Sequence, residues 1–271
     1  MTGEDSHGSG DAIPETVYDR IFRLDGRRAV VIGAGSGIGR EAALALAAHG
    51  AEVVCVDQDE AAAGRVAKGA GPGSEAYRLD LFDVEAIRRS AHDLGPVDVL
   101  VHTPAMNVRK RLLDQTPEDV RRVISLNLEA VYETVRAFGA QMQQRGRGSF
   151  IGIASIRAFT VEPGQGIYAA TKAAMIQLLR TAAVELGPSG VRVNAIAPGV
   201  VETPLTEQIR RNAEWYDAYA RKGALGRWAQ ASEIAGAVVY LAGDAASFVT
   251  GSCLMVDGGW TAVDGRYEPP P

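Results

Sequence analysis

Cysteine and histidine are scarce in this sequence, which holds two cysteines, Cys55 and Cys253, and four scattered histidines. Both cysteines lie in apolar runs and are typical of buried free thiols, and the histidines lack metal-ligand spacing. We therefore expect neither a disulfide nor a metal site. No run of about 18 apolar residues occurs, so no membrane span is expected.

Basic residues are outnumbered, with 28 Lys and Arg against 33 Asp and Glu and a net charge of -5. This balance gives no reason to expect nucleic acid or an anionic membrane as a partner. The amino-terminal residues are rich in glycine, serine and acidic groups, unlike a secretory signal. We expect a cytoplasmic protein whose partner is a small-molecule substrate.

The 271 residues are 46% hydrophobic, which suits one large α/β domain. Polar, glycine-rich residues at the start predict a disordered tail over 1–21, and three final prolines predict a loose tail over 264–271. Residues 22–263 form the single predicted domain, without a linker or a repeat.

Short runs rich in Val and Ile alternate with helical patterns in this domain. The runs are mostly apolar throughout, as expected of strands buried on both faces of a parallel sheet. The alternation predicts a doubly wound α/β fold. The stretch 200–225, with Trp215 and Tyr219, predicts a mobile helical flap over a site. The predicted strands cover 28–33, 51–57, 75–81, 97–103, 148–155, 191–198 and 252–258, and the predicted helices cover 37–49, 83–94, 117–144, 166–187 and 231–243.

The first predicted strand runs into Gly33-Ala34-Gly35-Ser36-Gly37-Ile38-Gly39, which opens a helix. Glycines let the backbone approach a pyrophosphate closely, and the helix amino end offers N–H groups and positive dipole. Since a strand precedes the turn and a helix follows it, the context favours a dinucleotide site over a purely structural turn.

Asp57 ends the second predicted strand, where a carboxylate can accept both ribose hydroxyls of NAD and repels a 2′-phosphate. No basic residue stands beside it, and Ser36 leaves the glycine turn without a basic side chain. These features favour NAD over NADP. The alternative is that Asp57 is a solvated turn residue.

Tyr168 and Lys172 are spaced so that both emerge on one helix face. A nearby ammonium stabilises phenolate and lowers the tyrosine pKa, which predicts a proton-transfer group. Ser155 closes a strand at the edge where ligands of parallel sheets bind. Asn127 lies within an apolar helical pattern, either bonded to a neighbouring carbonyl or holding a water that relays protons behind Lys172.

Together these residues resemble the short-chain dehydrogenase/reductase family over residues 22–262. The resemblance implies a single-domain Rossmann-like three-layer αβα sandwich with a parallel, seven-stranded sheet, and a homotetramer or homodimer. It implies Asn127, Ser155, Tyr168 and Lys172 as the catalytic tetrad. The cofactor contacts that it implies are Gly33, Ser36, Gly37, Ile38, Gly39, Asp57, Asp80, Leu81, His102, Tyr168, Lys172, Pro198, Gly199, Val201 and Thr203.

Two positions depart from the family pattern. Ile32 replaces the usual Thr before the glycine turn, which removes a hydroxyl that bridges this turn to the fourth strand. His102-Thr103-Pro104-Ala105 replaces the usual Asn-Asn-Ala-Gly. If the loops around residue 32 and residues 102–105 touch, a side chain from the second loop can replace the hydroxyl that is missing at position 32.

The segment IASIRAF and the ending VDGGW resemble branches of the family that act on sugars and sugar acids, such as gluconate 5-dehydrogenase. Two sets of basic residues could pair with a substrate carboxylate: Arg157, or the group Arg109, Lys110 and Arg111. Solvated basic loops are the alternative. We therefore predict an NAD-dependent dehydrogenase of a secondary alcohol in a sugar acid, sugar or polyol. A 3-oxoacyl thioester reductase and a catalytically silent NAD-binding sensor are the alternatives.

Overall fold

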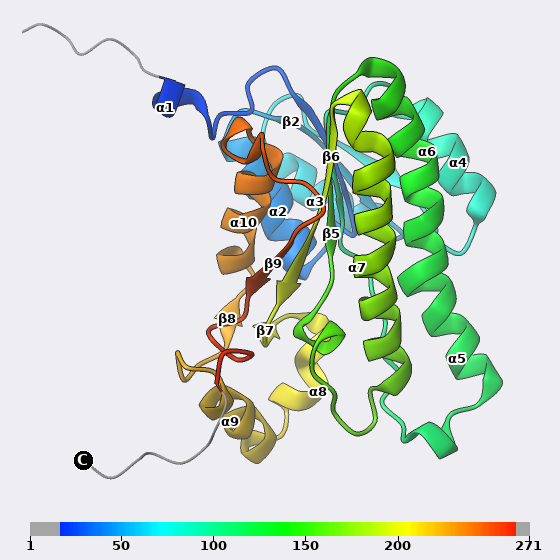
Figure 1. The fold of residues 1–271 in the computed structure, drawn as a ribbon, viewed down its shortest axis with the longest axis vertical. Coiled ribbons are helices and arrows are strands. Elements are labelled where there is room, and N and C mark those ends of the chain that lie inside the picture. Colours follow the sequence, from blue (N-terminus) through cyan, green and yellow to red (C-terminus); the bar gives the residue numbers. More distant parts are fainter. Residues whose placement is uncertain (1–16, 264–271) are drawn as a thin grey trace, which may run out of the picture.

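The computed structural model describes residues 17–263 of the chain, except for the side chain of Asp19. Its centre is a seven-stranded sheet in the order β3-β2-β1-β4-β5-β6-β9, in which every strand pair is parallel (Figure 1). The seven predicted strands are the strands of this sheet. Their bounds are β1 (Arg28–Ile32), β2 (Glu52–Asp57), β3 (Glu75–Arg78), β4 (Val99–His102), β5 (Gly148–Ile153), β6 (Val191–Pro198) and β9 (Cys253–Val256).

Helices cover both faces of the sheet and make it the middle of three layers (Figure 1). One face packs on α2, α3 and α10, and the other packs on α4, α6 and α7. Successive β1 residues serve opposite layers, Val30 the second and Val31 the first, which explains the continuous apolar runs. The longer helices are α2 (Gly37–Ala48), α3 (Glu60–Ala70), α4 (Val84–Asp93), α5 (Pro117–Ile124), α6 (Ala130–Arg145), α7 (Gly166–Leu186), α9 (Ala213–Lys222) and α10 (Ser232–Ala242).

Two helical segments differ from the prediction. Helix α3 was not predicted, because its buried face consists of Ala62, Ala63, Val66 and Ala67 and gives little apolar contrast. Its start is nonetheless signalled by Asp59, whose side chain accepts a hydrogen bond from the amide of Ala62. The predicted helix over 117–144 is interrupted by a π-helical turn, Ser125–Glu129, which contains Asn127.

The segment 200–225 is helical, as predicted, but in two short pieces. After β7 (Val201–Glu202), which pairs with β8 (Ala229–Gln230), it forms α8 (Glu207–Arg210) and α9. Tyr219 of α9 is buried against two tryptophans, with ring centroids 5.7 Å from Trp228 and 5.3 Å from Trp260. This aromatic cluster anchors α9 beside the carboxyl edge of the sheet.

Parts of both predicted tails, residues 1–16 and 264–271, lie outside the described residues. Within the predicted amino-terminal tail, Val17–Arg20 forms the short helix α1, and the next carbonyl, of Ile21, accepts a hydrogen bond from the amide of Ala245.

Cys55 and Cys253 are free thiols. Among residues 17–263, no helix combines the length and apolarity needed to cross a bilayer.

Candidate active site

The glycine turn between β1 and α2 is shaped by close backbone packing. Gly33 and Gly37 have φ angles of 82° and 53°, which residues with a side chain rarely adopt. A Cβ on Gly39 would lie 2.1 Å from the carbonyl oxygen of Gly33. Ser36 is the N-cap of α2, and its side chain makes no capping hydrogen bond. The first amides of α2, including that of Ile38, lack intrahelical partners and are available to an anion.

A cavity of about 430 Å³ lies beside this turn. Gly35, Ser36 and Gly37 line one side of it, and Thr203 and Pro204 line the other. A Cβ on Gly37 would lie 3.3 Å from Cγ2 of Thr203, so a side chain there would narrow the space. The bare backbone, the helix amino end and the cavity fit the pyrophosphate of a dinucleotide.

Asp57, at the end of β2, turns its carboxylate toward the glycine turn. Its Oδ2 accepts a hydrogen bond of 2.9 Å from the amide of Gly35, and its Oδ1 accepts one of 3.0 Å from the amide of Asp59. Each carboxylate oxygen has a further lone pair. The glycine turn therefore fixes the orientation of Asp57 while leaving it able to accept from ribose hydroxyls.

Three of the expected cofactor contacts lie on the neighbouring strand ends. Strand β3 ends at Arg78, so Asp80 and Leu81 lie in the turn that follows, where Asp80 is exposed and Leu81 is buried. His102 ends β4 and is fully buried, and both its ring nitrogens lack a hydrogen-bond partner in the described part of the chain. The His102 side chain does not reach the surface, and a cofactor contact at this residue stays a prediction.

The residues that follow β6 form the side of the 430 Å³ cavity opposite the glycine turn. A Cβ on Gly199 would lie 2.8 Å from Cα of Asp257, so this close approach requires glycine. Pro198 and Val201 are buried on either side of it. This packing carries the chain to Thr203, which faces Gly37 across the cavity.

Ser155, Tyr168 and Lys172 come together where β5 meets α7, and each is at most 8% exposed. Ser155 Oγ accepts a hydrogen bond of 3.1 Å from the amide of Arg157 and is also hydrogen-bonded to the Tyr168 hydroxyl. Lys172 Nζ lies 5.9 Å from the centroid of the Tyr168 ring and donates to the carbonyl of Ile153 over 2.7 Å. The helical spacing thus places phenol and ammonium together, as the sequence analysis expects.

The pKa of Tyr168 does not follow the expectation that Lys172 lowers it. Burial raises the pKa of Tyr168, and the Ser155 hydrogen bond and the charges of Arg109 and Arg157 offset part of that rise. Burial also lowers the pKa of Lys172 to about 7, and its ammonium bonds a backbone carbonyl. In this structure two arginines, rather than the lysine, supply the charge that favours phenolate.

Asn127 is fully buried in the π-helical turn and uses both ends of its amide. Its Oδ1 accepts from the amide of Met106 over 2.9 Å, and its Nδ2 donates to the carbonyl of Met106 over 2.9 Å and to Oγ1 of Thr171 over 3.2 Å. The side chain therefore pins the loop after β4 to α7, next to Lys172. A role in proton relay stays a prediction.

Arg157, expected as a substrate contact, is already neutralised within the protein. Its guanidinium forms an ion pair with Glu162, donates to Tyr219 Oη over 3.1 Å and lies 5.6 Å from the ring centroid of Trp260. Because these partners hold its charge, Arg157 joins the loop after Ser155 to α9, and the case for it as the carboxylate-binding group is weakened.

Arg109, unlike Arg157, has no acidic partner among residues 17–263. It lines a cavity of about 70 Å³ together with Ser155 and Tyr168. Its Nη1 is buried with no hydrogen-bond partner among residues 17–263, and its guanidinium carbon lies 5.8 Å from the ring centroid of Trp215 on α9. The neighbouring Lys110 is paired with Asp119 at 2.7 Å. Arg109 is thus the basic side chain best placed for an anionic ligand.

Sequence reasoning missed three polar residues near this cavity, namely Asn107, Glu162 and Gln165. They lie in loops after β4 and β5 and carry no periodic signal. The one available signal was the position of Gln165 directly before the helix that holds Tyr168.

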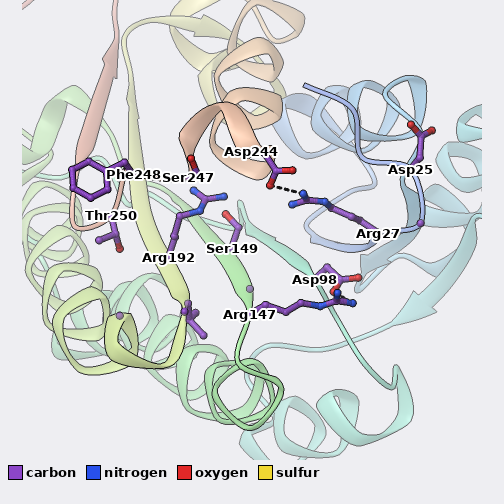
Figure 2. A pocket seen from close by; sticks show the side chains of 15 residues that line it. Asp25, Arg27, Asp98, Arg147, Ser149, Arg192, Asp244, Ser247, Phe248 and Thr250 are labelled. Carbon is purple, nitrogen blue, oxygen red and sulfur yellow. Dashed lines mark hydrogen bonds and ion pairs between the residues drawn. The ribbon is translucent and has the colours of Figure 1, made fainter. Parts of the chain in front are cut away.

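A larger cavity, of about 650 Å³, lies at the opposite end of the sheet (Figure 2). It is formed where β1, β5 and β6 begin. Its arginines include Arg27, which is paired with Asp244 at 2.6 Å, and Arg147, which is paired with Asp98 at 3.2 Å. Since the side chains expected to be catalytic lie at the other edge of the sheet, we do not place the reaction here.

Comparison with known proteins agrees with the fold. A family model described as enoyl-(acyl carrier protein) reductase matches residues 33–261. Galactitol 2-dehydrogenase (L-tagatose-forming) from Cereibacter sphaeroides is 38% identical over 250 residues, which cover 90% of this chain and 98% of the relative. Gluconate 5-dehydrogenase from Gluconobacter oxydans is 35% identical over 248 residues, which cover 89% of this chain and 97% of the relative.

Solved structures of similar sequence have the same fold. A putative NAD(P)-dependent gluconate 5-dehydrogenase from Beutenbergia cavernae, with bound NADP at low occupancy, superposes with a TM-score of 0.87. It is 38% identical in sequence, and the match covers 90% of this chain and 100% of that one.

Proposed function

The chain belongs to the short-chain dehydrogenase/reductase family of oxidoreductases, and we propose that it oxidises a secondary alcohol of a sugar acid with NAD as the acceptor. The observation that carries this proposal is the unpaired Arg109 in the cavity that also holds Ser155 and Tyr168. A cation without an acidic partner in the described part of the chain, close to the reacting groups, suits a substrate that brings a carboxylate.

In the proposed oxidation of an alcohol, each residue of the site has a separate role. The nicotinamide supplies the hydride acceptor when the dinucleotide is bound. Tyr168 removes the hydroxyl proton, and Ser155, fixed by the amide of Arg157, orients the substrate oxygen. Burial raises the pKa of Tyr168, and the charges of Arg109 and Arg157 offset part of that rise, so they favour the phenolate relative to a site without them.

The preference for NAD rests on Asp57. Its carboxylate is held beside the glycine turn by Gly35, where a 2′-phosphate would meet a negative charge. The relatives named above act on galactitol and gluconate, which fits a polyhydroxylated substrate. An acyl thioester offers no carboxylate to Arg109, so we favour the sugar acid over that alternative.

A substrate and cofactor panel tests the proposal. The purified full chain is assayed with gluconate, other hexonates and galactitol, each with NAD and with NADP, by the absorbance of the reduced dinucleotide. We expect kcat/KM to be highest for a sugar acid with NAD. Turnover confined to uncharged polyols or acyl thioesters, or a clear preference for NADP, would overturn the corresponding part of the proposal.

A further inference from the structure

Asn107 carries a second unpaired polar atom near the reacting groups. This residue lies in the loop after β4 and lines the cavity of about 70 Å³ that Ser155 and Tyr168 also line. Its side-chain oxygen Oδ1 is buried and has no hydrogen-bond partner within the described part of the chain. Buried carbonyl oxygens are nearly always paired in native proteins, so a vacant one beside a reaction site calls for a ligand donor.

A chain of hydrogen bonds decides which end of the Asn107 amide is left vacant. Glu162 is held by Arg157 and by the hydroxyl of Tyr219. As a carboxylate it only accepts, so the amide nitrogen of Gln165 must turn toward it. Gln165 Oε1 then accepts from Asn107 Nδ2 over 2.7 Å. The oxygen of Asn107 is therefore the free end, because the network fixes an amide orientation that shape alone does not.

This network is well shielded from water. Gln165 is 5% exposed and Arg157 is 7% exposed. The ring of Tyr219 is packed against Trp228 and Trp260, so the acceptor end of the network, at Glu162, is anchored in the aromatic cluster under α9. Asn107 thus presents a preorganised acceptor, whereas Arg109, its neighbour in the same cavity, presents a donor.

We propose that Asn107 is a specificity-determining residue whose side-chain oxygen accepts a hydrogen bond from a substrate hydroxyl other than the one that Tyr168 deprotonates. This inference rests on the proposed function and restricts the range of substrates that it allows. The substrate carries a second hydroxyl within reach of the loop after β4, in addition to a carboxylate for Arg109. A hydrogen atom, keto group or methyl ether at that carbon cannot donate and leaves Asn107 unpaired.

A substrate-deletion cycle tests this assignment. Wild type and Asn107→Leu are compared on gluconate and on the series of its monodeoxy analogues. For one analogue, the wild type should lose at least about tenfold in kcat/KM relative to gluconate, while Asn107→Leu shows almost no difference between the two compounds. If Asn107→Leu lowers kcat/KM by one common factor for every compound, or by none, the residue does not read a hydroxyl.

Gln165→Met provides a second, milder variant, since it frees the Asn107 amide to rotate without removing it. We expect Gln165→Met to lose part of the discrimination against the same analogue. The matched control is Gln177→Met, on an exposed position of helix α7, which begins directly after Gln165; this variant should keep the full discrimination. Equal discrimination by all three proteins would contradict the role of the network.

Binding separates this inference from the proposed function. The affinities of gluconate and of the same analogue are measured on the Tyr168→Phe protein with NAD present, by tryptophan fluorescence. A difference that Asn107→Leu abolishes supports the hydroxyl contact even if the wild type turns neither compound over, in which case only the proposed function fails. Turnover by the wild type without any such difference in affinity or in kcat/KM overturns the inference alone.

Discussion

The hydroxyl of Thr103 donates a hydrogen bond of 2.8 Å to the carbonyl of Ile32. The same oxygen, Oγ1 of Thr103, lies 3.4 Å from the carbonyl oxygen of Gly33. A Cβ on Gly33 would lie 2.4 Å from this Oγ1, so the contact requires glycine at position 33. The contact joins the end of β4 to the glycine turn. It replaces, from the opposite side, the bridge that the family pattern assigns to a hydroxyl at position 32.

Thr103→Val should weaken both the fold and the dinucleotide site. Removing one partly buried hydrogen bond costs about 1 kcal/mol of unfolding free energy, and the glycine turn loses the contact that steadies it. Adding Ile32→Thr to this variant should recover part of the loss. Urea unfolding and NAD affinity check this, with Thr181→Val on the exposed side of α7 as the control. Equal behaviour of Thr103→Val and the control would refute the compensation.

Lys172→Met should stabilise the cofactor-free protein most at neutral and lower pH. Burial lowers the pKa of Lys172 from its ordinary 10.5 to about 7. Below pH 7 the lysine is charged in both folded and unfolded chains, so the full desolvation cost is present. Above pH 7 the folded chain releases the proton first, and the cost shrinks as the pH approaches 10.5.

Chemical unfolding of wild type and Lys172→Met at several pH values between 6 and 10 measures this. We expect the variant to gain a few kcal/mol at the acidic end, in proportion to the pKa shift, and less at the basic end. A gain that does not change with pH would mean that Lys172 is not desolvated.

His102→Leu should reduce the acid sensitivity of the fold. Burial and the charge of Lys172 lower the pKa of His102 from 6.5 to about 3. The unfolded chain therefore takes up a proton below pH 6.5 that the folded chain refuses, and stability is lost as the pH falls toward 3. The slope from this residue is at most about 1.4 kcal/mol per pH unit.

The measurement is the free energy of unfolding of wild type and His102→Leu across this acid range. The two curves should diverge as the pH falls, with the variant the more stable protein in acid. Parallel curves would show that His102 titrates in the folded protein and is not buried as described. His49, which is bonded to its own helix at Ala45, offers a control as His49→Gln.

Arg109→Met should discriminate between acidic and neutral substrates. The methionine keeps an apolar stem against Trp215 but removes the charge. We expect kcat/KM for gluconate to fall about 10- to 100-fold further than kcat/KM for galactitol. Both substrates lose the Arg109 charge that favours the phenolate, but only gluconate also loses the partner of its carboxylate. Lys110→Met is the control, because Lys110 is paired with Asp119 outside the cavity. A similar loss for both substrates would assign Arg109 to Tyr168 rather than to a carboxylate.

Much of the fold followed from local sequence patterns. All seven strands of the sheet were predicted, most of them from Val- and Ile-rich runs, because parallel strands buried on two faces are apolar along most of their length. The edge strand β3 is the exception, since its residues are partly exposed and include neither Val nor Ile. The helical spacing of Tyr168 and Lys172 placed both at β5, beside Ser155. Helix α3 was missed because alanines bury a helix face without the contrast on which periodicity depends.

The charge pairing of the site could not be read from the sequence. Arg157 stands closest to Ser155 in sequence, yet Glu162 neutralises its charge and Tyr219, from α9, accepts a hydrogen bond from it. Arg109 remains unpaired, because the fold brings no carboxylate of residues 17–263 to it. Whether a charge is free depends on contacts between distant segments, and only the folded chain shows them.

The most direct test of the account is the Tyr168→Phe variant, which removes one oxygen from the cavity. We expect NAD affinity within about threefold of wild type, because the glycine turn and Asp57 are untouched. Turnover of the best sugar acid should fall by at least about a thousandfold, the scale of a positioned acid–base group. Turnover within tenfold of wild type, with NAD bound equally well, would contradict Tyr168 as the group that moves the proton.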